Sequence, residues 1–214
     1  MAQVGMHRIW LFDFDGTLVD SEELILDSFR HATAAVLGAV PPDDVLRSGI
    51  GRTLVQQAEE LAGERAQELF DVYVEHNRMR HPELLRVFPG VPEMLERLHA
   101  SGARLGVVTA KIRPTLELGF EHAPLDTSLF DVIVAKEDTE SHKPEPEPLL
   151  LALRLLGAEP ADAIYVGDSP FDIQAAHAAG VTAAAAAWGE IFSRDVLVAE
   201  RPHRVFDSPA EVAA

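Results

Sequence analysis

Two aspartates stand at the end of an apolar run near the start of the chain. In "RIWLFDFD" (8–15), Asp13 and Asp15 occupy positions where a buried strand would continue. Side chains two residues apart on a strand project to the same face, and two carboxylates about 4 Å apart repel by roughly 4 kcal/mol at an effective dielectric near 20. The pair Asp15 and Gly16 also favours a two-residue hairpin, which leaves Asp13 unexplained. A bound Mg²⁺, which takes hard oxygen ligands, would explain both acids.

A second acidic segment, "GDSPFD" (167–172), follows another apolar run. Asp168 ends that run, Ser169 is a residue type that caps helices, and a proline follows in the first turn. Parallel strands end at one edge of a sheet, so we expect the carboxylates of Asp168 and the two earlier aspartates to form one Mg²⁺ site. Asp172, one helical turn further, is placed to orient a neighbouring cation.

Two further polar residues fall at the same predicted edge. Thr109 ends the run "RLGVVT", and Lys143 precedes a helix in "SHKPEPEPL". Taken alone, a threonine at this position is as often a helix cap as a ligand, and a single lysine is more often a surface residue than a ligand. Beside the carboxylates, a hydroxyl and an ammonium group are suited to hold phosphate oxygens.

Together these residue types allow one phosphoryl-transfer reaction. A carboxylate oxygen of Asp13 can attack phosphorus and form an aspartyl-phosphate. Asp15 can protonate the leaving oxygen and then deprotonate the water that hydrolyses the intermediate. Mg²⁺ would neutralise charge between the nucleophile and the phosphate, while Thr109 and Lys143 hold the equatorial oxygens. A strand end suits these acids because the rigid sheet fixes the position and direction of the nucleophile.

Apolar runs that end in polar or small residues alternate with helical stretches along most of the chain. This alternation predicts an α/β fold with a doubly wound, Rossmann-like parallel sheet covered on both faces. The expected strands are 8–15, 104–110, 131–138, 163–169 and, as a fifth strand despite its alanines, 181–188. The expected helices are 92–100, 115–121, 146–156 and 172–179.

Residues 20–86 interrupt this alternation. They contain segments with helical periodicity and no convincing strand, namely 21–38, 43–49, 52–63 and 64–80. We therefore predict an α-helical cap domain over 20–86, inserted into a core that is formed by 1–19 and 87–214. The two junctions are expected to act as hinges.

The composition excludes several other classes of protein. The chain has 214 residues, with 35 Asp and Glu against 18 Lys and Arg and a formal net charge of −17. Nucleic-acid binding usually needs a basic patch, so we expect no nucleic-acid partner. The absence of cysteine excludes disulfides and thiol chemistry. The first residues lack a long apolar segment, so we expect no membrane span and a cytoplasmic monomer or homodimer.

Four segments, taken in order, resemble the motifs of a known family. The segments "DFDGTLVD", "VVTA", "HKPEPEPL" and "VGDSPFD" are similar to those of the haloacid dehalogenase superfamily of phosphohydrolases, and the resemblance covers essentially the whole chain. It implies Asp13 as nucleophile, Asp15 as acid/base, and Thr109 and Lys143 as phosphate ligands. It also implies Mg²⁺ on Asp13, Asp168 and the main-chain carbonyl of Asp15, and a C1 cap that closes over the substrate.

Substrate choice is expected to depend on residues around these motifs. The segments "SEELILDSFRHA", "YVEHN" and "FDVIVAKED" resemble pyrophosphatase-like and phosphoglycolate phosphatase-like members, which implies a small anionic phosphorylated substrate. Gly16, Ser169 and Asp172 are expected to support the site, and Ala110 stands at a substrate-facing position where members often carry Asn. Arg52, in the cap segment "SGIGRTL", either meets an anionic leaving group or is an exposed arginine at a helix start.

Three kinds of activity fit these residues. The first is a Mg²⁺-dependent phosphohydrolase that cleaves phosphoglycolate, pyrophosphate or a similar small metabolite. The second is a phosphosugar mutase, against which Ile25 counts, because mutases of this superfamily carry a histidine ten residues after the second aspartate. The third is a non-enzymatic, receiver-like phospho-acceptor domain, which lacks both a cap and an acid at the position of Asp15. We therefore predict a phosphohydrolase.

Overall fold

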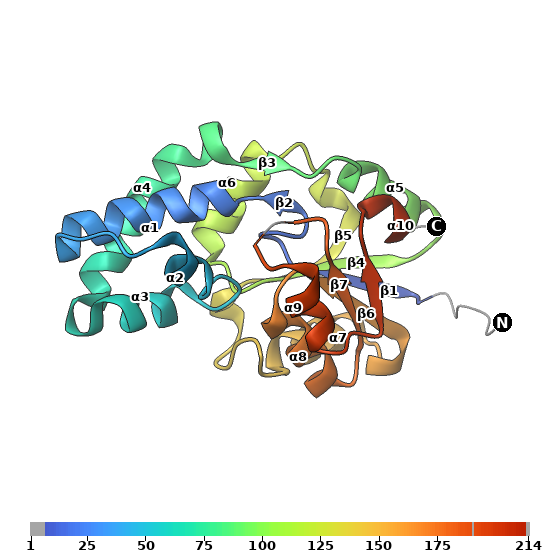
Figure 1. The fold of residues 1–214 in the computed structure, drawn as a ribbon. Helices are drawn as coiled ribbons and strands as arrows, with labels where there is room; N and C mark the ends of the chain where they lie inside the picture. Colours follow the sequence, from blue (N-terminus) through green and yellow to red (C-terminus); the bar gives the residue numbers. More distant parts are fainter. Residues whose placement is uncertain (1–6, 190, 213–214) are drawn as a thin grey trace.

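The core of the structure is one parallel β-sheet. A computed structural model describes residues 7–189 and 191–212, and within them six strands pair in the order β5-β4-β1-β6-β7-β8 (Figure 1). The strands are β1 (Ile9–Phe12), β4 (Arg104–Val108), β5 (Phe130–Val134), β6 (Ala163–Gly167), β7 (Thr182–Ala186) and β8 (Arg204–Phe206). The chain starts in the middle of the sheet and adds strands first on one side and then on the other. The predicted doubly wound α/β core is therefore confirmed.

Helices cover both faces of this sheet. One face carries α5 (Val91–Ala100), α6 (Arg113–His122) and α10 (Pro209–Val212), and the other carries α7 (Glu147–Leu156), α8 (Pro170–Ala179) and α9 (Arg194–Ala199). Figure 1 shows α5 and α10 above the strands and α7, α8 and α9 below them. No helix in the described ranges is both long and apolar enough to cross a membrane.

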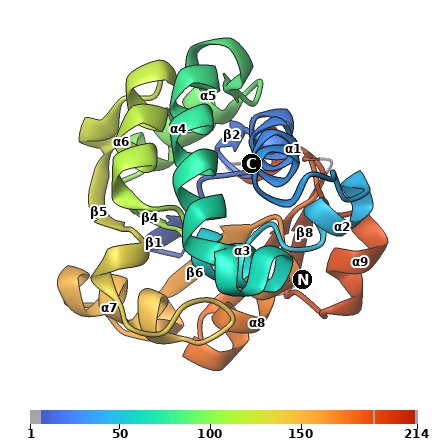
Figure 2. The ribbon, with the colours of Figure 1, turned by 90° about the vertical axis from the view of Figure 1, so that its left-hand side faces the viewer.

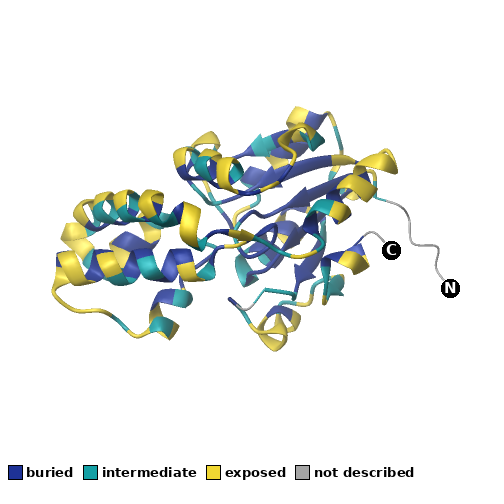
Figure 3. Cartoon of the chain, turned by 90° about the horizontal axis from the view of Figure 1, so that it is seen from above, coloured by how far each residue is buried: buried dark blue, intermediate teal, exposed yellow. Residues whose placement is uncertain are grey.

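The strands are apolar on both sides because both faces are buried. On β1, Trp10 and Phe12 pack into one hydrophobic cluster while Ile9 and Leu11 pack into the other. This alternation follows from the two-residue period of a strand. Burial on both faces explains why the run is continuously apolar, and Figure 3 shows the strands as the buried centre of the core.

The alanine-rich segment after α8 is a strand, as predicted. Helix α8 ends at Gly180, which has a positive φ of 70°, and β7 then pairs in parallel with β6 and β8. Ala183 and Ala185 lie in one cluster, and Ala184 and Ala186 lie in the other. Position between two strands therefore overrides the helix preference of alanine.

Four helices between β1 and α5 pack on one another beside the sheet. They are α1 (Glu22–Leu37), α2 (Asp43–Arg47), α3 (Leu54–Ala62) and α4 (Ala66–Leu84). These helices share a hydrophobic cluster of their own, in which the Phe29 and Tyr73 rings lie 4.5 Å apart between α1 and α4. Viewed from their side, in Figure 2, α3 and α4 lie in front of the sheet.

The two chain crossings between these helices and the sheet lie side by side. Short strands β2 (Val19–Asp20) and β3 (Arg86–Val87) pair antiparallel, and this pairing was not predicted. The domain boundaries expected after residues 19 and 86 both fall inside it. The division into a core and a cap remains a prediction, and its outermost residues, 1–6 and 213–214, lie outside the described residues.

Several predicted elements differ from the structure at their ends. Strand β1 stops at Phe12 instead of continuing to residue 15, because the chain then turns tightly over 14–19. Helix α6 begins at Arg113 instead of residue 115, since a proline fits the first turn of a helix. Strand β8 and the helices that follow β7 were not predicted.

Candidate active site

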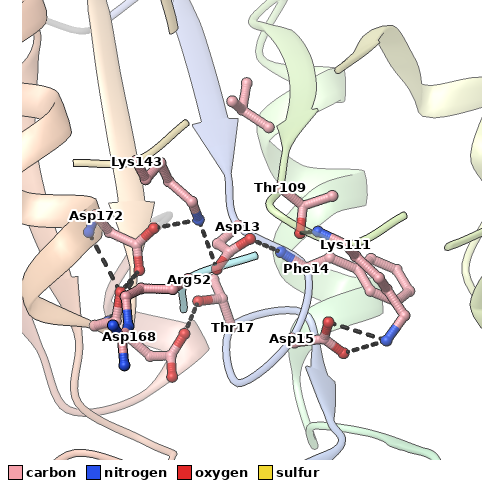
Figure 4. A network of polar contacts seen from close by, with 12 residues as sticks. Asp13, Phe14, Asp15, Thr17, Arg52, Thr109, Lys111, Lys143, Asp168 and Asp172 are labelled. Carbon is pink, nitrogen blue, oxygen red and sulfur yellow. Dashed lines mark hydrogen bonds and ion pairs between the residues drawn. The ribbon is translucent and has the colours of Figure 1, made fainter. Parts of the chain in front are cut away.

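Three strand ends place Asp13, Thr109 and Asp168 at one edge of the sheet (Figure 4). The N–H of Asp13 donates to the carbonyl of Val166 at 2.9 Å, and the N–H of Thr109 donates to the carbonyl of Val134 at 3.0 Å. Each residue therefore continues the backbone pairing of the sheet one step beyond its strand. The sheet itself fixes where these side chains begin.

Asp13 is enclosed at the centre of this edge. Its side chain is 5% exposed and its Oδ2 lies 3.0 Å from Nζ of Lys143. Oδ1 accepts a hydrogen bond from the N–H of Phe14 at 2.8 Å. Burial raises the pKa of Asp13 to about 6, although the Lys143 charge opposes the rise. The hydrogen bond and the ion pair hold the carboxylate in a single orientation.

Lys143 is a buried cation between two aspartates. Its Nζ lies 2.6 Å from Oδ1 of Asp172 as well as 3.0 Å from Asp13. It also donates to the hydroxyl of Tyr165 at 3.1 Å. Burial alone would lower the pKa of Lys143, but the charges of Asp13 and Asp172 outweigh burial and raise that pKa above its usual value. The ammonium therefore stays charged beside Asp13.

Asp172 holds Lys143 in place from the first turn of α8. Its Oδ1 accepts from Lys143 and from the hydroxyl of Tyr165. Its Oδ2 accepts from both the N–H and the Oγ–H of Ser169, whose hydroxyl caps the same helix. Lys143 and Ser169 thus supply three hydrogen bonds to Asp172, and the single hydroxyl proton of Tyr165 is shared between Asp172 and the carbonyl of Val108. The cation that Asp172 orients is thus the lysine.

Asp168 approaches Asp13 from the neighbouring strand. Its Oδ1 accepts a hydrogen bond from the hydroxyl of Thr17 at 3.0 Å. Burial, followed by the charges of Asp172 and Asp13, raises the pKa of Asp168 well above its usual value. Gly16 makes room for this carboxylate, because a Cβ atom there would lie 2.1 Å from Oδ2 of Asp168.

These three acids are suited to hold a metal ion. Asp13, Asp168 and Asp172 each offer one oxygen, and the three oxygens lie within 4.8 Å of one another. Because Lys143 supplies one positive charge against three carboxylates, the buried cluster retains excess negative charge that a divalent cation would balance. Asp172 accepts more hydrogen bonds than Asp13 or Asp168, so the latter two have more lone pairs free for a metal.

The side chain of Asp15 does not join this group, which corrects the prediction that the carboxylates of Asp13, Asp15 and Asp168 lie together. Asp15 follows the end of β1, so the two-residue period of a strand does not apply to it. Its carboxylate instead pairs with Nζ of Lys111, at 2.9 and 3.0 Å (Figure 4). A metal contact through the main-chain carbonyl of Asp15 stays a prediction.

Lys111 was missed as a functional residue. It is one of three lysines in the chain and lies two residues after Thr109, and these two facts were the available signal. Its N–H donates to Oγ1 of Thr109 at 3.3 Å, which links both residues in one turn. That turn places Thr109 toward Asp13 and Lys111 toward Asp15.

A cavity between the sheet edge and the four helices joins these residues. Asp13, Asp15, Thr109, Ala110 and Lys111 contribute to its wall, and so does Arg52 from the helical side. The carboxylate of Glu60 pairs with Arg52, and the guanidinium lies 5.8 Å from the ring of Phe171. Of the predicted substrate residues, Thr109, Ala110 and Arg52 line this cavity. Lys143 is not part of its wall but contacts Asp13, which is.

Helix α4 contributes polar residues that the sequence analysis did not identify. Tyr73 and Asn77 line the cavity, and His81 follows one turn later with the same four-residue spacing. His81 is buried, and burial followed by the Lys111 charge lowers its pKa to about 4. The available signal in the sequence was the four-residue spacing of these three polar residues, which places them on one helix face.

The chain matches the family model of haloacid dehalogenase-like hydrolases over residues 10–186. It therefore belongs to this family, and the resemblance inferred from its four motifs is confirmed. The prediction that the protein is a hydrolase is confirmed with it.

Relatives with assigned names are similar to the chain over nearly its whole length. Pyrophosphatase PpaX of Bacillus cereus is 37% identical over 203 residues, which cover 94% of this chain and 93% of that protein. The structure of a predicted phosphoglycolate phosphatase from Haemophilus somnus has a TM-score of 0.86 at 25% identity, covering 98% of this chain and 97% of that one. A mutant of CbbY from Rhodobacter sphaeroides, in complex with xylulose-1,5-bisphosphate, has a TM-score of 0.83 at 25% identity, with 95% of each chain covered.

Proposed function

We propose that the protein is a Mg²⁺-dependent phosphohydrolase that cleaves a small phosphorylated metabolite through an aspartyl-phosphate intermediate. Phosphoglycolate, inorganic pyrophosphate and similar small anionic compounds form the substrate class. Helices α1–α4, within residues 20–86, act as the cap that encloses the substrate. The proposal further includes a cytoplasmic monomer or homodimer without a nucleic-acid or membrane partner.

The observation that carries this proposal is the environment of Asp13. A carboxylate is a weak nucleophile, so its direction must be fixed and its repulsion with the anionic phosphate must be neutralised. The N–H bond of Asp13 to the sheet fixes the direction, and Nζ of Lys143, 3.0 Å from Oδ2, neutralises the charge. Asp13 lies at the wall of a cavity, so an incoming phosphoryl group can reach the carboxylate.

The reaction follows from the positions of these groups. An oxygen of Asp13 forms a bond to phosphorus while the bond from phosphorus to the leaving oxygen breaks, and the leaving oxygen takes the electron pair and a proton from Asp15. Asp15 then accepts a proton from the water that attacks the aspartyl-phosphate, which returns Asp13 as a free carboxylate. Thr109 and Lys143 hold the remaining phosphoryl oxygens.

A Mg²⁺ ion would fit the acids of this site. Asp13 and Asp168 offer hard oxygen donors with free lone pairs, and the cluster carries excess negative charge. When bound, such an ion supplies charge neutralisation between the carboxylates and the phosphoryl oxygens.

The named pyrophosphatase among the relatives favours a small anionic leaving group. The charged side chains of Arg52 and Lys111 at the cavity wall support the same choice.

A phosphosugar mutase is the second candidate, favoured by the sugar bisphosphate bound to the related CbbY structure. Ile25 counts against it, because this apolar side chain lines the cavity at the position where mutases carry a histidine. A strict requirement for a sugar bisphosphate during turnover would favour the mutase.

A panel of phosphorylated compounds tests the proposed activity. Purified protein with Mg²⁺ is assayed for released phosphate from pyrophosphate, phosphoglycolate, p-nitrophenyl phosphate and a set of sugar phosphates. We expect release to be fastest from the small anionic compounds and to require Mg²⁺. No release from any compound, at a protein concentration where the fold is verified by circular dichroism, would refute the proposal.

A further inference from the structure

Lys111 is an enclosed cation whose role the reaction above leaves open. Its side chain is 7% exposed and its Nζ pairs with both oxygens of Asp15. Both side chains lie at the wall of the cavity that also contains Asp13. Lys111 therefore lies at the cavity beside the residue that addresses the leaving oxygen, whereas Lys143 contacts the nucleophile (Figure 4).

The ammonium of Lys111 has an unused donor. A lysine ammonium carries three N–H groups, and the two oxygens of Asp15 account for two of them. In the described part of the chain, Nζ makes no other hydrogen bond. One N–H thus remains for a ligand without loss of the bond to Asp15.

The backbone and stem of Lys111 are held in place. Its N–H donates to Oγ1 of Thr109 and its carbonyl accepts from the N–H of Lys136 at 3.1 Å. The Nζ atom lies 6.0 Å from the ring centre of Phe14, within the range of a cation–π contact. A flexible surface lysine would have none of these contacts. They therefore fix the position of the Lys111 charge relative to the core.

We propose that Lys111 binds an anionic oxygen of the leaving group and selects substrates whose leaving group carries its own negative charge close to the scissile bond. This inference rests on the proposed phosphohydrolase activity and narrows its substrate class. The matching compounds are pyrophosphate, in which the leaving group is a phosphate, and phosphate esters of small hydroxy acids, in which it carries a carboxylate.

The bond changes explain what Lys111 contributes. As the bond between phosphorus and the leaving oxygen breaks, its electron pair moves onto a group that is already an anion. The proton that Asp15 delivers neutralises one charge at most, and the N–H of Lys111 stabilises the charge that remains. Lys111 acts here as a hydrogen-bond donor only, so no further reactant is needed.

Two other cations lie at or near the cavity, and each has an acidic partner. Lys143 is held by Asp13 and Asp172 and faces the transferred phosphoryl group. Arg52 is engaged by Glu60 on the helical side, and its side chain is 26% exposed, against 7% for Lys111. An enclosed charge interacts more strongly with an anion than an exposed one, which favours Lys111 for this role.

Kinetics of Lys111→Met on two kinds of substrate test the proposal. Methionine keeps the length of the side chain without the charge, and Lys136→Met, which alters a lysine outside the cavity, is the matched control. We expect Lys111→Met to lower kcat/KM about 10- to 100-fold for pyrophosphate and phosphoglycolate. For p-nitrophenyl phosphate, whose leaving group bears no second anion, the loss should be about tenfold smaller, because it reflects only the altered contact with Asp15. Lys136→Met should behave like the wild type on all three.

Equal losses on all three substrates would overturn the proposal, because Lys111 would then act only through Asp15. No loss on any substrate would overturn it as well. If the wild type released phosphate from none of them, the proposed function would fail, and a binding measurement would still decide the role of Lys111.

That measurement uses calorimetry with Mg²⁺ and two non-hydrolysable probes, methylenediphosphonate and methylphosphonate. We expect the wild type to bind the diphosphonate more tightly, and Lys111→Met to lose most of that preference while Lys136→Met keeps it. A wild type without the preference, or a Lys111→Met variant that retains it, would refute the proposal independently of turnover.

Discussion

The Nζ atom of Lys143 lies 2.6 Å from Oδ1 of Asp172, and both side chains are almost completely buried. Because Asp172 is itself held by hydrogen bonds from Ser169, it keeps the lysine beside Asp13. We predict that Asp172→Asn lowers kcat about 10²- to 10³-fold, since the ammonium loses its fixed position. Steady-state assays of phosphate release with Mg²⁺ measure this.

Ser169→Ala is the matched control for this prediction. It removes a bond to Oδ2 of Asp172 and leaves the bond between Asp172 and Lys143 intact. We expect a stability loss of about 1 kcal/mol from the missing helix cap and a much smaller loss of kcat. Equal kcat values for Asp172→Asn and the wild type would show that Lys143 needs no such support.

Substitution of Gly16 tests whether the turn after β1 needs a glycine to leave room for the Asp168 side chain. Gly16 and Gly38 have nearly the same φ, 74° and 73°, but a Cβ atom would meet Asp168 only at Gly16 and would meet nothing within 4 Å at Gly38. We predict that alanine at either position costs about 1–2 kcal/mol of unfolding free energy, and that Gly16→Ala costs about 1–3 kcal/mol more. Chemical denaturation compares the two. Equal losses would mean that the turn adapts without disturbing the carboxylate.

Stabilisation by Mg²⁺ should depend on pH. The pKa of Asp13 is raised to about 6, so the folded state binds a proton more tightly than the unfolded state, and the ionised carboxylate destabilises the fold as pH rises through 6. A divalent cation needs that ionised form. We therefore predict that millimolar Mg²⁺ raises Tm by several degrees at pH 7.5 and hardly at all at pH 5. A Tm shift of equal size at both pH values would contradict a site built on Asp13.

The pKa of His81 predicts a second pH dependence of stability, opposite in sign to the contribution of the Asp13 carboxylate. Its folded pKa of about 4 lies below its usual value of 6.5, so the unfolded chain binds more protons between these values and stability falls as pH drops from 6.5 to 4. The loss amounts to about 3 kcal/mol at the lower end. We predict that His81→Gln flattens the curve of unfolding free energy against pH in this window. The control His99→Gln, at an exposed position, should keep the wild-type slope, and a His81→Gln curve with that slope would contradict the assignment.

The positions of Asp13, Thr109 and Asp168 were predictable because they depend on one rule of the fold. Each follows an apolar run, and the ends of neighbouring parallel strands meet at one edge. Lys143 was predictable only because it lies in one of the four segments that resemble family motifs, since a single lysine in a loop gives no sequence pattern. Its burial depends on Asp172, which is distant in sequence.

The side chain of Asp15 and the role of Lys111 were not predictable in the same way. The direction of Asp15 depends on where β1 ends and how the next six residues turn, and an apolar run does not mark that end to within two residues. The pairing with Lys111 joins residues 96 positions apart. The polar residues of α4 that line the cavity depend on how the helices pack against the sheet, which periodicity alone does not specify.

The most direct test of the account is chemical trapping of the phosphorylated residue. Protein that is turning over pyrophosphate or phosphoglycolate with Mg²⁺ is quenched in acid and reduced with borohydride, which converts an aspartyl-phosphate into homoserine. Peptide mass spectrometry then locates the change. The account predicts homoserine at position 13, and none in the Asp13→Asn variant. An active enzyme that shows no homoserine, or shows it at another aspartate, would contradict it.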